Sequence, residues 1–341
     1  MGQHARALKT FGIGVVGAVA FAVAGLPLPF LLGPMAACIV AALARVPMQG
    51  PGWLGQLMRT ILGVAVGSAI TPALIGRLPD IAVSIALLVP YVLLIGLIGF
   101  PFFHRLCGFD RPTAFYAAMP GGFQDMVVFG EEAGADMRAL SLIHATRILV
   151  IVALIPLVMS FGFDKTLAVR PGQAAVETPA WELALMAVCA IGGWQVARRV
   201  GLFGASILGP MIATAALSLA GIITHRPPAE AIIVAQLFIG VSIGAKYSGL
   251  TLRELRMDVG AGAVFSLGLC ALAAVVAWAS HRLSGAPGLD ALLAFSPGGQ
   301  AEMAVLALIS GADLAFVVAH HVVRITMVIL CAPLVAQRLE P

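Results

Sequence analysis

Two copies of one short motif place a helix breaker and a carboxylate inside a very apolar sequence. Pro120-Gly121-Gly122 is followed by Asp125, and Pro297-Gly298-Gly299 is followed by Glu302. Pro and Gly disfavour helix, so each motif should end one helix and allow another to begin. If a short helix starts after the second glycine, the acid lies in its first turn. There it can cap free backbone N–H groups and complement the helix dipole.

A basic pair follows each breaker inside an apolar run. LSLIHATRILVIV carries His144 and Arg147, and VVAHHVVRITMVI carries His320, His321 and Arg324. Residues three apart lie on one face of a helix. A charge at the centre of a membrane helix costs about 2.5 kcal/mol or more, so such residues usually face a partner or a wet cavity. Histidine can also carry a proton near neutral pH.

The natural partners for these arginines are the acids of the breaker motifs, within one copy or across the two. A buried charge pair at a transport site and a structural ion pair near the membrane interface, with the arginine snorkelling, are both compatible with the pattern. The breaker could likewise be a surface loop. Its apolar flanks AFYAAM and MVVF favour a re-entrant hairpin or a broken helix instead.

These positions define the candidate solute-binding residues. They are Pro120, Gly121, Gly122, Asp125, His144, Arg147, Pro297, Gly298, Gly299, Glu302, His321 and Arg324.

The two motifs belong to a duplication that covers most of the chain. The second copy lies 177 residues after the first, and GVAVG at 63–67 recurs as GVSIG at 240–244 with the same offset. LLGPM at 31–35 recurs as ILGPM at 207–211. The duplication predicts a first membrane repeat at 11–160, a linker at 161–180 and a second membrane repeat at 181–336.

The amino-acid composition indicates that these repeats lie in a lipid bilayer. The 341 residues are 60% hydrophobic and 11% charged, with a mean hydropathy of +1.02. Long apolar runs predict an all-α polytopic membrane protein. Five spans are expected in each repeat, besides the breaker segment: 11–25, 27–45, 54–73, 80–102 and 137–160, then 182–197, 202–223, 231–248, 259–281 and 314–336.

The N-terminal run resembles a cleaved signal peptide, with basic residues before a short apolar stretch. Residues 11–24 correspond, however, to 182–196 in the second repeat, so a retained helix is expected. If the breaker segment is re-entrant, each repeat has five spans and the repeats are inverted. If it spans, each has six and they are parallel. The sorting of Lys and Arg between loops favours inversion.

Several chemistries find no support in the sequence. Five scattered cysteines and no CxxC spacing predict neither disulfides nor a zinc site. No GxSxG, HExxH or P-loop motif indicates an enzyme. No basic helix suggests contact with nucleic acid. We therefore expect no metal, no cofactor and no catalytic residue.

The motif PGG-x-x-(D/E)-M followed by G-A-D and H-x-x-R resembles the AbrB family of duplicated bacterial membrane proteins. Both copies are intact, and the resemblance covers about 11–336. It implies a multi-pass protein of the bacterial inner membrane. Members carry labels such as transcriptional regulator or ammonia monooxygenase. The dispersed histidines argue against a copper oxygenase, because only His320 and His321 are neighbours and they point about 100° apart.

Two functions follow as hypotheses. The first is a secondary transporter or permease for a small solute, with its site between the repeats and a proton or sodium ion as coupling ion. The second is a membrane-embedded regulatory protein that influences gene expression through a partner. The lipid bilayer is the one partner that both hypotheses require.

Overall fold

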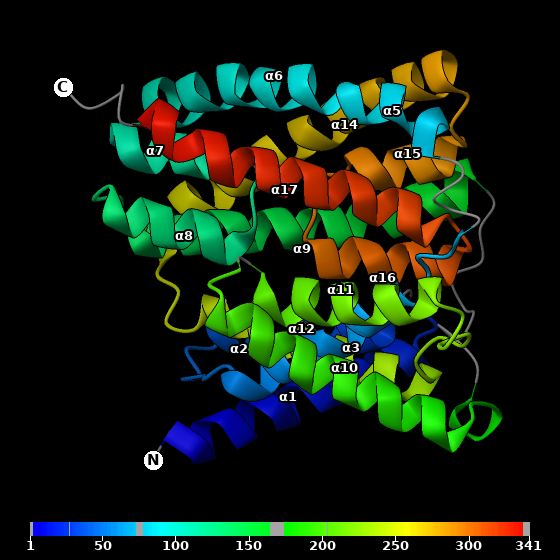
Figure 1. Cartoon of the computed structure of the whole chain (residues 1–341). Coiled ribbons are helices and arrows are strands. Elements are labelled where there is room, and N and C mark those ends of the chain that lie inside the picture. The colour runs from blue at the N-terminus through cyan, green and yellow to red at the C-terminus, as the bar shows by residue number, and fades with distance from the viewer. Residues whose placement is uncertain (1–2, 27, 73–77, 164–173, 203, 337–341) are drawn as a thin grey trace. The chain divides into compact units, whose positions relative to one another are not determined.

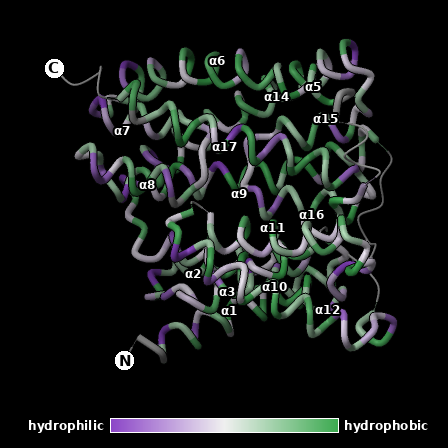
Figure 2. Tube along the Cα trace, viewed as in Figure 1, coloured by the Kyte–Doolittle hydropathy of each residue, from purple (hydrophilic) through white to green (hydrophobic). Residues whose placement is uncertain are grey.

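The fold was analysed in a computed structural model, which describes residues 3–26, 28–72, 78–163, 174–202 and 204–336 (Figure 1). Within these ranges the chain is helical and contains no strand. Seven helices in the described part are long and apolar enough to cross a membrane. Figure 2 shows the apolar residues that dominate them. The described part thus has the all-α composition of a polytopic membrane protein.

Three of the ten expected spans are short. The helices α2, α3 and α11 have 15 residues each. At 1.5 Å per residue each is about 22 Å long, less than the ~30 Å of a bilayer core. The expected helix at 11–25 is longer than predicted and runs over Gln3–Val23. Of the expected linker 161–180, residues 164–173 lie outside the described residues.

The chain divides into two compact units, and each unit takes helices from both sequence repeats. The first unit consists of residues 1–78, 159–250 and 304–315. Its helices are α1 (Gln3–Val23), α2 (Pro29–Leu43), α3 (Trp53–Gly67), η2 (Ala175–Glu177), α10 (Ala180–Arg199), α11 (Ala205–Leu219), α12 (Ala229–Gly244) and η3 (Ala245–Tyr247).

Glycines bring helices of the first unit into backbone contact. A Cβ atom on Gly33 would collide with the backbone of Gly17, which places α1 directly on α2. Gly193 and Gly209 make the equivalent contact between α10 and α11. Small residues at a membrane interface permit this approach, and van der Waals packing then holds the helices together.

Helices of one repeat also pack against helices of the other repeat in this unit. Gly63 of α3 lies against Ile207, and Gly67, one turn later, lies against Met211. Because both positions advance together along the chain, α3 and α11 run parallel. Gly240 on Leu31 and Gly244 on Met35 make α12 and α2 parallel in the same way.

The second unit consists of residues 79–158, 251–303 and 316–341. Its helices are α5 (Leu78–Ala86), α6 (Leu88–Pro101), η1 (Phe102–Leu106), α7 (Arg111–Ala118), α8 (Phe123–Glu132), α9 (Met137–Gly162), α13 (Leu252–Glu254), η4 (Leu255–Val259), α14 (Gly260–Ser284), α15 (Gly288–Phe295) and α17 (Leu314–Ala336). The ends of α5, α9 and α17 extend past its boundaries by a few residues, and α16 (Gln300–Ser310) begins in this unit and continues into the first.

The helices α5 and α6 run antiparallel to α14 in this unit. Ser84 of α5 contacts Ser280, while Gly99 of α6 contacts Phe265. The residue number rises from Ser84 to Gly99 while that of the contacting residue falls from Ser280 to Phe265, which is the pattern of antiparallel helices. The α5–α6 segment is the second of the long apolar spans in chain order, and α14 is its equivalent in the second repeat.

Candidate functional site

Both breaker motifs lie in the second unit and separate two short helices. The helix α7 ends at Ala118 and α8 begins at Phe123; in the second copy α15 ends at Phe295 and α16 begins at Gln300. The residues between them, including Pro120 and Pro297, are non-helical. The predicted breaks are therefore present in both copies.

The chain reverses direction at the first break. His144 and Arg147 of α9 bond to the carbonyls of Tyr116 and Met119, so α7 runs parallel to α9. The helix α8 instead runs antiparallel to α9, because Phe123 faces His144 while Gly130 approaches Leu140. The segment α7–α8 is consequently a helical hairpin with Pro120-Gly121-Gly122 at its tip.

Arg147 lies at this tip and bridges two main-chain carbonyls. Its Nη1 donates to Met119 O at 2.8 Å and its Nη2 to Gly121 O at 3.0 Å. Met119 is the C-cap of α7, and a helix C-terminus leaves carbonyls without intrahelical partners. A planar guanidinium fork suits two such acceptors and complements the negative end of the dipole.

Arg324 repeats these contacts 177 residues later. Its Nη1 donates to Ser296 O at 2.9 Å and its Nη2 to Gly298 O at 3.2 Å. His321 Nε2 bonds to Leu293 O at 3.0 Å, as His144 Nε2 does to Tyr116 O at 3.1 Å. The two arginines are 3% and 1% exposed, so both charges are buried.

The expected ion pair between Arg147 and Asp125 does not form among the described side chains, because the guanidinium is already engaged by the carbonyls of the break. The Asp125 carboxylate instead folds back over Gly122, where a Cβ atom would collide with it. The Glu302 carboxylate lies over Gly299 in the same way. Both acids stand in the first turn of their helix, which favours the capping role.

Three buried nitrogen atoms of the basic pairs keep no hydrogen-bond partner within the described part of the chain: Arg147 Nε, Arg324 Nε and His144 Nδ1. Each Nε carries an N–H that only donates. Two buried cations therefore each retain one donor for an additional acceptor.

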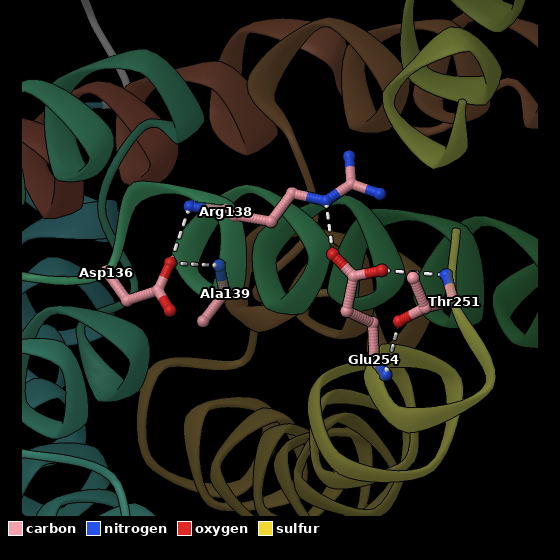
Figure 3. A network of polar contacts seen from close by, with 5 residues as sticks. All are labelled: Asp136, Arg138, Ala139, Thr251 and Glu254. Carbon is pink, nitrogen blue, oxygen red and sulfur yellow. Dashed lines mark hydrogen bonds and ion pairs between the residues drawn. The ribbon is translucent and has the colours of Figure 1, made fainter. Parts of the chain in front are cut away.

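The start of α9 is anchored by a polar network on the same unit (Figure 3). Asp136 caps α9 by accepting from the backbone N–H groups of Arg138 and Ala139. Arg138 Nε donates to Glu254 at 2.7 Å, and Glu254 forms a capping box with Thr251. The network ties α9, which carries Arg147, to the segment that precedes α14.

An apolar cleft of about 370 Å³ lies beside the first break. It lies between α6, α7 and α17, and its lining includes Leu93, Phe115, Met119 and Met327. The lining carries no charged side chain.

A family model described as "Transition state regulatory protein AbrB" matches residues 30–340. The chain belongs to the AbrB family. Two relatives are similar over almost their full length. "Uncharacterized protein YhjN" of Bacillus subtilis is 27% identical over 348 residues, covering 94% of this chain and 90% of the relative. "Putative regulator AbrB" of Escherichia coli is 27% identical over 322 residues, covering 94% and 92%. The resemblance predicted from the breaker motifs is thereby confirmed.

Sequence reasoning placed the AbrB-family motif on the right helices but missed its acceptors. Main-chain carbonyls leave no mark in a sequence, so the targets of Arg147 and Arg324 could not be read from it. Sequence reasoning also missed Tyr91, whose hydroxyl donates to Phe295 O at 2.7 Å just before the second break. A tyrosine within an apolar run was the available signal.

Proposed function

We propose that this AbrB-family protein is a secondary transporter or permease of the bacterial inner membrane for a small anionic solute. One observation carries the proposal: two buried guanidiniums, each at a break between two short helices, engage carbonyls and keep the Nε–H free of partners within the described residues.

Electrostatics favours an anion over a cation or a neutral solute. Burying an unpaired charge is expensive, and carbonyl dipoles offset only part of that cost. A carboxylate or phosphate oxygen would offset the rest, and it would accept from the remaining N–H groups. The starts of α8 and α16 already carry Asp125 and Glu302. The arginines are therefore the groups left to hold the solute.

The helix directions support inverted repeats. The equivalent spans α5–α6 and α14 are antiparallel, as inversion requires. Parallel packing of α3 on α11, and of α12 on α2, fits as well, since α2 and α3 are consecutive spans of opposite direction. A hairpin at the first break supports a re-entrant segment, because both of its ends lie on one side. Inverted repeats with a broken helical segment in each are typical of alternating-access transporters.

The test is ligand binding by purified protein in nanodiscs. Thermal shifts are measured with phosphate, acetate, succinate and citrate, and with ammonium and putrescine as cationic probes. We expect at least one anion to stabilise the wild type, and Arg147→Gln together with Arg324→Gln to abolish that shift. Arg198→Gln is the matched control, because Arg198 lies at the exposed end of α10. Uptake of the stabilising anion into proteoliposomes then tests transport. Stabilisation by cations alone, or an anion shift that survives both substitutions, would refute the proposal.

The description of the family model and the name of the Escherichia coli relative support one alternative, a membrane-embedded regulator that influences gene expression through a partner. This alternative predicts a stable complex with another protein. Crosslinking in bacterial membranes followed by affinity purification would detect it, and failure to recover a reproducible partner would count against it.

A further inference from the structure

A chain of buried hydroxyls leads to one histidine of the second unit. Ser84 of α5 lies 2.8 Å from His320 Nε2 and 2.8 Å from the hydroxyl of Ser280 on α14. Ser84, Ser280 and His320 are fully buried. Ser284, one turn beyond Ser280, is partly exposed at the end of α14. The chain thus joins a buried imidazole to the end of a helix.

The hydrogen bonds have one consistent direction. His320 Nδ1 lies 2.8 Å from Phe316 O, which can only accept, so Nδ1 carries the proton and Nε2 of the neutral ring is an acceptor. Ser84 must then donate to Nε2, and Ser280 must donate to Ser84. Such a chain can pass a proton by successive transfers: Ser84 gives its proton to Nε2 and receives one from Ser280, which is reprotonated through Ser284 from water.

Each hydroxyl ends with the proton count it began with, and His320 becomes an imidazolium. The longest step is Ser280 to Ser284, at 3.4 Å. The Ser284 hydroxyl donates to Ser280 O at 2.8 Å and must rotate towards the Ser280 hydroxyl for the transfer.

The chain of hydroxyls and histidine is present at one of the two equivalent places only. The positions equivalent to His320, Ser280 and Ser84 are Ile143, Phe103 and Ala261, and all three are buried. Apolar side chains therefore fill the equivalent place in the other copy without any polar group. The need to fill space thus does not account for the serines and the histidine. The second repeat alone carries a titratable residue here.

Charged, titratable and aromatic groups surround His320 and can influence whether its ring binds a second proton. On its own helix lie His321 and Arg324, and His321 Nδ1 is 3.2 Å from the Arg324 guanidinium. Tyr91 of α6 packs edge-on against Phe295, whose ring also meets His320. Phe316 lies 4.3 Å from His320 between ring centroids, and aromatic faces can stabilise an imidazolium. The Arg324 guanidinium stands one helical turn from His320 and carries the same sign of charge as an imidazolium.

From this arrangement we infer that His320 is the coupling-proton site and that Ser284, Ser280 and Ser84 are its proton path. The inference rests on the proposed function. An anion bound at Arg324 would cancel the opposing charge, so solute and proton would favour one another's binding, and by linkage the effect is reciprocal. The expected transport mode is symport of a proton with an anion.

The test follows the His320 proton itself and needs no solute. Wild-type protein with ¹⁵N-labelled histidine side chains is reconstituted in bilayers, and His320→Gln assigns the His320 signals by NMR. We expect the Nδ1–H tautomer near neutral pH. Ser84→Ala and Ser280→Ala should slow the exchange of His320 between its neutral and imidazolium forms, followed at Nε2 by ¹⁵N exchange NMR on acidification, by about tenfold, the effect of losing one hydrogen bond in the path. Ser84→Thr, which restores a hydroxyl, should recover most of that rate.

Ser266→Ala is the matched control, because Ser266 is a buried serine of α14 whose hydroxyl donates to Gly262 O instead. An Nε2–H tautomer in the wild type, or exchange unchanged by Ser84→Ala and Ser280→Ala, would overturn the inference. Neither result would affect anion binding at Arg147 and Arg324. Conversely, loss of the anion shift in the arginine variants leaves the His320 exchange rates interpretable, so the two proposals can fail separately.

Discussion

Arg147 of α9 is bonded to the carbonyl of Met119, the residue that caps the C-terminus of α7. This contact converts an interruption of the helix into a defined corner, because the exposed carbonyls of the last turn acquire a buried, charged donor. Arg324 does the same for Ser296 at the end of α15. The arginines are thus part of both helix breaks as well as candidates for solute binding.

Replacing Arg147 or Arg324 by lysine should destabilise the protein although the charge is kept. Lysine has no planar fork and cannot bridge two carbonyls, so at least one buried acceptor loses its donor. We expect a loss of roughly 1–3 kcal/mol in the free energy of unfolding for each variant. The measurement is the unfolding midpoint in detergent, with Arg198→Lys as the exposed control. Equal midpoints for all three variants would contradict the bridging role.

Alanine at Gly122 or Gly299 should distort the start of the following helix. The added Cβ atom would occupy the position of the Asp125 or Glu302 carboxylate, which must then give up its capping position. The loss of a cap costs about 1 kcal/mol.

Gly192→Ala and Gly268→Ala provide matched controls, because a Cβ atom on either glycine meets nothing within 4 Å. Replacing either of these helical glycines by alanine should slightly increase the stability of the protein, because alanine has the higher helix propensity. Unfolding midpoints distinguish the cases. Destabilisation of the control variants to the same extent would show that the carboxylate contact is not the cause.

Alanine at Gly209 should separate α10 from α11. Its Cβ atom would collide with the backbone of Gly193, and backbone cannot move aside as a flexible side chain can. Overpacking of this kind costs about 1–3 kcal/mol. Gly33→Ala should behave alike at the equivalent contact of α1 and α2. The measurement is the unfolding midpoint of each variant. Gly12→Ala on α1 is the reference, because a Cβ atom on Gly12 meets nothing within 4 Å.

Replacing Glu254 by glutamine should have only a small effect on stability. The Arg138–Glu254 pair is partly exposed, with side chains 39% and 21% accessible, so water screens it. We expect a loss of at most about 1 kcal/mol, decreasing as salt is added. Asp136→Ala should cost about as much through loss of the α9 cap and should be insensitive to salt. Denaturation at low and high salt separates the two.

Much of this architecture could be predicted from residue types. Apolar runs predicted the long helices, Pro and Gly predicted both breaks, and the fixed offset of 177 residues predicted that Arg147 and Arg324 would occupy equivalent places. The length of α2 could not be predicted, because its apolar flanks extend beyond Pro29–Leu43 although the helix does not.

The carbonyl partners of Arg147 could not be predicted for a related reason. Side-chain charge is visible in a sequence, and the carbonyls that a broken helix exposes are not. Ser84 and Ser280 gave no signal at all, since serines are common in apolar helices and only the crossing of α5 with α14 brings these two to His320.

In the proposed transporter, the presence of His320 in one repeat and Ile143 in the other affects the direction in which solute moves. Two chemically identical inverted repeats would make the states open to either side of the membrane mirror images of equal free energy, and neither side would be preferred. A single ionisable residue breaks that equality. The state open to one side of the membrane would then be more populated than the state open to the other. The pH of one compartment would set the ratio of the two populations.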